Sequence, residues 1–103
     1  MTWVKVFNST KEIEVELIEN RVGKKLIGDK YLCFAYHEKQ LFAFEESCPH
    51  LNQSLLGGSC DDGNVICPVH QYKFNLQSGQ GHGLSLLKYP IKKEGDQYFI
   101  KLK

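Results

Sequence analysis

Two Cys-Pro segments, each followed by a histidine, stand sixteen residues apart in this chain of 103 residues. They are Cys48-Pro49-His50 and Cys67-Pro68-Val69-His70. Proline restricts its own φ angle and favours an extended conformation for the residue before it, so each cysteine is expected at the start of a stiff bend. The sequence therefore predicts two preorganised loops, and each loop offers a thiolate and an imidazole to a metal.

The spacing Cys-x-His, sixteen residues, Cys-x-x-His resembles the signature of Rieske and Rieske-type ferredoxin domains. In that family two cysteines bind one iron of a [2Fe–2S] cluster and two histidines bind the other. The resemblance implies one such cluster, with Cys48 and Cys67 on the inner iron and His50 and His70 on the outer iron. It covers roughly residues 26–102, and its further matches are Gly57-Gly58, the segment 72–76 and Gly79.

A structural zinc site is the alternative interpretation of the same four residues, because tetrahedral sulfur and nitrogen ligation also suits zinc. Zinc ribbons and fingers usually begin with two cysteines that are two to four residues apart. Here each segment combines one cysteine with one histidine, and a single residue separates Cys48 from His50. The pattern favours the iron–sulfur cluster and leaves a zinc-stabilised binding module without redox activity as a competitor.

The ligand set bears on the reduction potential of the cluster. Two thiolates neutralise a core of two ferric ions and two sulfides, whereas four would leave it dianionic, and Rieske centres accordingly span roughly −150 to +300 mV against about −400 mV for plant-type clusters. In respiratory members of the family, serine and tyrosine hydroxyls raise the potential from positions where this chain has Tyr72 and Phe74. Phe74 has no donor and Tyr72 differs from serine in shape, so we expect the low half of the span.

The other two cysteines are expected to have no ligand role. Respiratory members join the two loops by a disulfide, from positions where this chain has Gln53 and Val69, so no disulfide is expected here. The absence of a disulfide fits a reducing compartment. Cys33 lies in an apolar run and is predicted to be a buried small hydrophobe, and Cys60 is predicted to be an ordinary loop residue.

The other two histidines, His37 and His82, have no cysteine at ligand spacing. Both are expected to be exposed or lightly packed. His82 belongs to the glycine-rich stretch 79–83, which is a candidate for a third loop over the cluster.

Short apolar or alternating segments, rich in β-branched and aromatic residues, predict an all-β fold. Their spacing indicates an antiparallel β sandwich or barrel, and the resemblance adds a small inserted cluster-binding lobe at about 46–72. Hairpin turns are expected at Gly28-Asp29, Glu38-Lys39 and Gly95-Asp96. The expected strands are 3–7, 24–27, 31–36, 40–44, 65–66, 72–76, 86–91 and 98–102.

The segment 10–22 is left undecided. Ile13, Val15 and Leu17 alternate with glutamates, which indicates a strand by period. Glutamate is a poor strand former, however, and the related family tends to have irregular or helical structure here.

Length and composition predict a single domain over residues 1–103, with 42% hydrophobic residues for its core. A net charge of +1 provides no general attraction to nucleic acid or to an anionic membrane. The beginning of the chain lacks the apolar run of a signal peptide, and no segment reaches membrane-spanning length. We therefore expect a cytoplasmic monomer.

The resemblance implies a soluble one-electron carrier that passes electrons from a reductase to a terminal oxygenase. The 33 residues after His70 are too few for the mononuclear-iron domain of a catalytic oxygenase subunit, so an electron-transfer protein rather than a stand-alone enzyme is expected. The alternative is a small subunit of a larger reductase, such as assimilatory nitrite reductase. In either case the exposed edge of His50 or His70 is the expected docking point, framed by Leu51, Val69 and Gln71.

Overall fold

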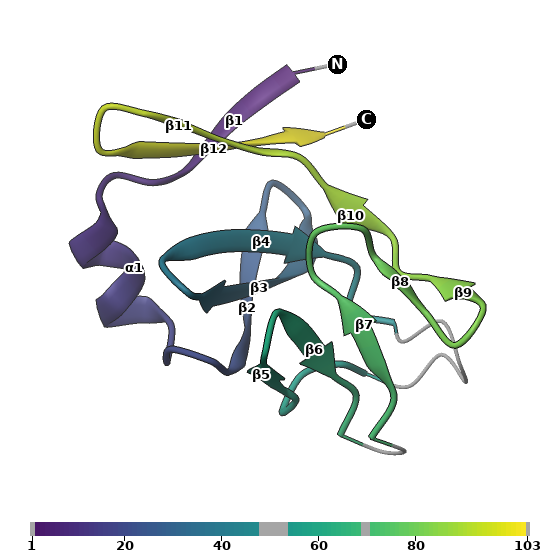
Figure 1. The fold of residues 1–103 in the computed structure, drawn as a ribbon. Helices are drawn as coiled ribbons and strands as arrows, with labels where there is room; N and C mark the ends of the chain where they lie inside the picture. Colours follow the sequence, from purple (N-terminus) through teal and green to yellow (C-terminus); the bar gives the residue numbers. More distant parts are fainter. Residues whose placement is uncertain (1, 48–53, 69–70, 103) are drawn as a thin grey trace.

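The computed structural model describes residues 2–47, 54–68 and 71–102, and antiparallel strands dominate it (Figure 1). The strands form sheets in the orders β1-β12-β11, β10-β4-β3-β2, β5-β6-β7 and β8-β9. This arrangement confirms the predicted all-β fold. The elements are β1 (Thr2–Phe7), α1 (Thr10–Glu16), β2 (Val22–Ile27), β3 (Lys30–His37), β4 (Gln40–Phe44), β5 (Ser59–Asp61), β6 (Asn64–Ile66), β7 (Lys73–Asn75), β8 (Gln80–Gly81), β9 (Leu84–Ser85), β10 (Lys88–Tyr89), β11 (Ile91–Glu94) and β12 (Gln97–Leu102).

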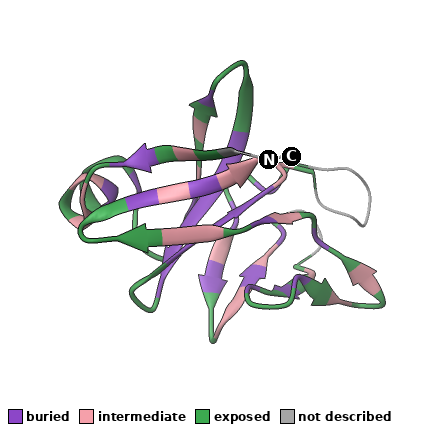
Figure 2. Cartoon of the chain, turned by 90° about the horizontal axis from the view of Figure 1, so that it is seen from above, coloured by how far each residue is buried: buried purple, intermediate pink, exposed green. Residues whose placement is uncertain are grey.

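The four-stranded sheet is the middle layer, and its strands β3 and β4 are buried on both faces. Leu32 and Phe34 of β3 enter a first core, which also contains Val6 and Ile100 of the three-stranded sheet β1-β12-β11. Cys33 and its alternating neighbours on β3 and β4 enter a second core, shared with the sheet β5-β6-β7. Figure 2 shows these buried residues along the central strands. Burial on both faces explains why β3 and β4 appear in the sequence as continuous apolar runs.

The three predicted hairpin turns are confirmed between β2 and β3, between β3 and β4, and between β11 and β12. Glu38 and Lys39 have φ angles of 51° and 63°, so both central residues of that two-residue turn are left-handed. Turns with this geometry match the right-handed twist of the paired strands. They place β2, β3 and β4 in consecutive antiparallel register.

The undecided segment contains the helix α1. Ser9 caps it, because its hydroxyl accepts a hydrogen bond from the amide of Glu12 at 3.1 Å. Ile13 and Leu17, one helical turn apart, are buried against the first core, whereas Val15 between them is 78% exposed. The apparent alternation was therefore misleading, because burial follows the helical period.

Several short strands were not predicted, namely β5, β8 and β9. They have two or three residues each, too few for a two-residue period to show in the sequence. The expected strand 86–91 is divided at Pro90, which separates β10 in the four-stranded sheet from β11 in the three-stranded sheet. Proline lacks the amide hydrogen needed for a central ladder, so the chain changes sheets there. Within the described ranges, no helix is long and apolar enough to cross a membrane.

Candidate metal centre

The first expected ligand loop is closed at its base. Ser47 and Ser54 form an antiparallel bridge, and the amide of Leu55 donates to the carbonyl oxygen of Glu46 at 2.7 Å. The hydroxyl of Ser54 also donates to Oε2 of Glu46 at 2.6 Å. We call residues 46–47 and 54–55 the first neck. The expected ligands Cys48 and His50 belong to the segment between its two sides, outside the described residues.

The second expected ligand loop is closed in a similar way at the open ends of β6 and β7. The amide of Cys67 donates to the carbonyl oxygen of Tyr72 at 2.8 Å, and the amide of Gln71 donates to the carbonyl oxygen of Cys67 at 2.9 Å. Gln71 has a φ angle of 60°, which lets the chain turn back within this loop. We call residues 67 and 71–72 the second neck. Val69 and the expected ligand His70 lie outside the described residues.

Gly58 joins the two necks. A Cβ atom placed on it would lie 2.5 Å from the carbonyl oxygen of Ile66, 2.9 Å from that of Leu55 and 3.4 Å from Cδ of Pro68. Real Cβ atoms essentially never approach other atoms within 3.0 Å, so this position requires glycine. Gly58 therefore packs closely against Leu55 of the first neck and against Ile66 and Pro68, the residues on either side of Cys67 of the second neck.

Cys67 is the expected ligand that lies within the described residues. Its side chain is 1% exposed and belongs to the second core, beside Leu55 of the first neck and Phe74 of β7. Because this side chain is shielded from water, the position of Cys67 suits an inner ligand of a metal centre.

The other two described cysteines are buried and unpaired. Cys33 on β3 is fully buried, as predicted, and burial raises the pKa of its thiol to about 12. The prediction for Cys60 was wrong: it lies in strand β5 rather than in a loop, and burial raises the pKa of its thiol to about 11. Both pKa shifts keep the thiols protonated at neutral pH, so neither is an activated nucleophile.

These pKa shifts predict slow alkylation in the folded protein. At pH 7 we expect Cys33 and Cys60 to react with iodoacetamide at least about 100-fold more slowly than after denaturation, because only the thiolate reacts. Peptide mass spectrometry of timed samples measures the two rates separately. Alkylation of Cys60 at the denatured rate would show that its thiol is open to solvent.

His37 is not exposed or lightly packed, as the sequence suggested, but 6% exposed. Its Nδ1 lies 2.6 Å from Oδ1 of Asn20, and its Nε2 accepts a hydrogen bond from the amide of Gly63 at 3.0 Å. Gly63 belongs to the β5–β6 turn, whereas Asn20 precedes β2. His37 therefore ties the sheet β5-β6-β7 to the four-stranded sheet and has a structural role.

His82 is exposed, as predicted, but its ring is not free of contacts. It stacks on the ring of Tyr72, with centroids 4.3 Å apart and planes at 23°. Nε2 of His82 also accepts a hydrogen bond from the amide of Lys73 at 3.3 Å. Sequence reasoning missed this contact with the second neck, and the Gly-His-Gly turn was the signal that could have suggested it.

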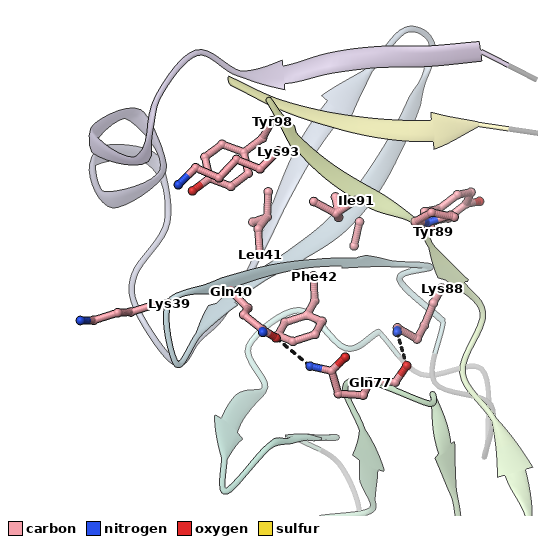
Figure 3. Close-up of a pocket in the computed structure, with 12 residues that line it drawn as sticks. Lys39, Gln40, Leu41, Phe42, Gln77, Lys88, Tyr89, Ile91, Lys93 and Tyr98 are labelled. Carbon is pink, nitrogen blue, oxygen red and sulfur yellow. Dashed lines mark hydrogen bonds between the residues drawn. The ribbon is translucent and has the colours of Figure 1, made fainter. Parts of the chain in front are cut away.

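A cleft of about 350 Å³ lies away from both necks (Figure 3). Leu41 and Ile91 line it, and so do Gln77 and Lys88. Nζ of Lys88 donates a hydrogen bond to the carbonyl oxygen of Gln77 at 2.7 Å. None of the residues that line it belongs to a neck or is an expected ligand. The cleft is therefore not the metal centre.

The four expected ligands define the chemistry of the candidate site. Two cysteines and two histidines provide two soft anionic ligands and two neutral ones. In the structure Gly58 packs against the ends of both loops, and Cys67 is buried. These features fit a centre with a buried thiolate end, and the assignment of Cys48, His50 and His70 to the same centre stays a prediction.

Comparison with known proteins identifies relatives of this chain. A family model described as the Rieske [2Fe-2S] domain matches residues 2–88. The ferredoxin component of the alkene monooxygenase system of Xanthobacter autotrophicus is 32% identical over 78 residues, which are 72% of this chain. The chain spans 64% of the length of that relative.

Two solved structures share the fold. The ferredoxin of carbazole 1,9a-dioxygenase from Nocardioides aromaticivorans matches with a TM-score of 0.79 and 16% identity, over 100% of both chains. A protein assigned as the small subunit of an NADPH nitrite reductase matches with a TM-score of 0.73 and 17% identity, over 99% of this chain and 100% of the other. At these identities the two structures support the fold alone.

Proposed function

This chain belongs to the Rieske [2Fe-2S] domain family, and from that premise we propose that it is a one-electron carrier between a reductase and a terminal oxygenase. The family implies one Rieske-type cluster. The observation that carries the proposal is the close packing of Gly58 against Leu55 of the first neck and Ile66 beside the second, with Cys67 buried at the base of the second. The ferredoxin component of an alkene monooxygenase system, 32% identical, supports the oxygenase partner.

We assign Cys48 and Cys67 to the inner iron, and His50 and His70 to the outer iron. When bound, the cluster accepts and releases one electron at a time. The second core excludes water from the sulfur of Cys67, and the hydrogen bonds of the necks hold the loop ends in place. The rings of His50 and His70 are then the proposed short route for an electron to a partner. Gln71, which follows His70 in the sequence, is exposed.

The surroundings of the second neck predict a low potential for a Rieske centre. Phe74 is fully buried in the second core and has no hydroxyl to donate, and the ring of Tyr72 is stacked on His82. We therefore expect a midpoint below about +150 mV in protein-film voltammetry or a dye-mediated titration. A higher midpoint would mean that a hydroxyl donor reaches the cluster despite this arrangement.

The decisive experiment is analysis of anaerobically purified protein. We expect iron and acid-labile sulfide in equal amounts, two of each per chain, and a rhombic paramagnetic signal in the reduced state. Zinc without sulfide, and no such signal, would replace the proposal by a zinc-stabilised binding module. A four-cysteine cluster would be recognised by a much lower potential, about −400 mV.

A fixed subunit of a larger reductase is the second candidate, because a nitrite reductase small subunit shares the fold. Purification from the native source without a tag separates the two. A carrier is expected to elute alone and to exchange electrons with a separately purified oxygenase. Constant co-elution with a large flavin or sirohaem protein would favour the subunit.

The proposal also includes a single domain over residues 1–103, with its cluster-binding lobe at about 46–72, and a monomer in the cytoplasm without nucleic-acid partners. The unpaired, buried thiols of Cys33 and Cys60 are compatible with a reducing compartment. The net charge of +1 supports the absence of a nucleic-acid partner. Sedimentation of the loaded protein tests the monomer.

A further inference from the structure

The turn between β8 and β9 is packed directly on the strand that leaves the second neck. Gly81 lies so close to β7 that an added Cβ would be 2.2 Å from the carbonyl oxygen of Lys73 and 3.0 Å from Cδ1 of Phe74. This approach of two backbones requires glycine. It brings the next residue, His82, over the start of β7.

His82 makes three contacts from that position. Its ring stacks on Tyr72, it meets the ring of Phe74 edge-on at 6.3 Å and 71°, and Nε2 accepts from the amide of Lys73. Because Nε2 is the acceptor, the ring proton of the neutral imidazole is on Nδ1. Three consecutive residues, 72–74, are thus held by one side chain.

The backbone of the turn is suited to this geometry. His82 and Gly83 have φ angles of 54° and 76°, so two left-handed residues in succession form the tight turn between β8 and β9. A left-handed histidine is uncommon, and its cost is offset here by the ring stack and the hydrogen bond. The side chain is therefore presented to β7 in a fixed direction.

Tyr72 connects His82 to the second ligand loop, because its ring contacts His82 and its backbone carbonyl is bonded to Cys67. Tyr72, under the His82 ring, accepts the hydrogen bond from the amide of Cys67 that closes the second neck. Tyr72 is also two residues after His70. A movement of Tyr72 would therefore change the separation of the two sides of the loop that holds both Cys67 and His70.

We propose that His82 is a positioning residue for the second ligand loop, which it holds through Tyr72 and Lys73. This inference rests on the proposed function, because the loop matters for redox only if it binds the cluster. The contacts of His82 are with residues 72–74 and not with Cys67, the ligand of that loop that lies within the described residues. It restricts the range of positions that the loop end adopts, and thereby the geometry of the histidine end of the centre.

Three substitutions separate the contacts of His82. His82→Phe keeps an aromatic ring on Tyr72 and removes the acceptor. His82→Asn keeps a hydrogen-bond acceptor in a residue type that tolerates the left-handed backbone, and removes the stacking ring. His82→Ala removes both. Asp62→Ala is the matched control, because Asp62 is exposed in the β5–β6 turn and has a φ angle of 52°.

Two measurements on the anaerobically loaded protein test the proposal. Hydrogen exchange with mass spectrometry follows the peptide that contains residues 71–75, and the paramagnetic spectrum of the reduced state reports the cluster geometry. For His82→Ala we expect exchange in this peptide to be about tenfold faster, since a hydrogen bond and a ring contact are lost. We also expect shifted g values, with smaller changes for His82→Phe and His82→Asn and none for Asp62→Ala.

Parent-like exchange and parent-like g values in His82→Ala would overturn the proposal. So would faster exchange with unchanged g values, because His82 would then be merely structural. If His82→Ala fails to fold, the same criteria apply to His82→Phe and His82→Asn. Failure of the proposed function is seen separately, as the absence of iron and sulfide from the parent protein.

Discussion

Gly58→Ala is expected to abolish stable cluster binding. Its new Cβ would lie 2.5 Å and 2.9 Å from the carbonyl oxygens of Ile66 and Leu55, and both are backbone atoms that cannot turn away. The amide of Gly58 also donates to Leu55, and its carbonyl oxygen accepts from Val22, so Gly58 itself is held. The two necks would have to separate, which moves the predicted ligand loops apart.

We expect this variant to retain less than about a tenth of the parent iron and to lose about 3 kcal/mol or more of unfolding free energy, at or above the upper end for overpacked sites. Iron analysis and denaturant unfolding of the apoprotein measure the two effects. Gly57→Ala is the matched control, since nothing lies within 4 Å of its Cβ and only its φ angle of 93° is strained. That control should cost about 1–2 kcal/mol and keep its iron. Equal losses in both variants would contradict the role of Gly58.

Cys67→Ala is expected to eliminate the cluster signal altogether. Cys67 is the proposed inner-iron ligand at the second neck, and no other described cysteine is on that neck. Cys67 would supply one of the two thiolates that hold the cluster, so its loss would leave too few ligands to retain it. The absorption and paramagnetic spectra of the anaerobically purified variant give the result directly.

Two matched controls exist, because Cys33 and Cys60 are buried in the same core as Cys67. Cys33→Ala and Cys60→Ala remove the same sulfur atom from the same kind of environment. Each should cost about 1 kcal/mol of stability from lost packing and retain the full cluster signal. A full signal in Cys67→Ala, or its loss in Cys60→Ala, would show that the ligand assignment is wrong.

Much of the two large sheets could be predicted from the sequence, because β-branched and aromatic residues recur with turn residues between them. The turn at Gly28-Asp29 was predicted from local chemistry, since glycine tolerates left-handed backbone. The turn at Glu38-Lys39 was predicted from its place between two apolar runs, because neither residue type favours the left-handed backbone that both adopt. The helix α1 could not be predicted. Its local signals were Ser9 followed by Glu12, a pattern that begins many helices, and the four-residue spacing of Ile13 and Leu17, but the alternation of apolar residues with glutamates competed with them.

Part of the candidate site could likewise be predicted from the sequence, and part could not. Its ligand types and spacing are visible in the sequence, because metals select particular donor atoms and proline stiffens the residues beside them. The contact of Gly58 with Ile66 and Leu55 is not visible there, nor is the stack of His82 on Tyr72. The paired residues are only three to ten positions apart, but their contacts are set by how the hairpins pack in space.

The sequence by itself determined the all-β architecture and the family, and it predicted the donor atoms, because these follow from residue types and their order along the chain. Only the tertiary structure decided which backbone atoms keep the two ligand loops together. That depends on the packing of β5, β6 and β7 against the four-stranded sheet, where Cys67 and Leu55 are buried in the same core. Close packing is a property of distances in space, and the positions of Gly58 and His82 acquire their meaning only there.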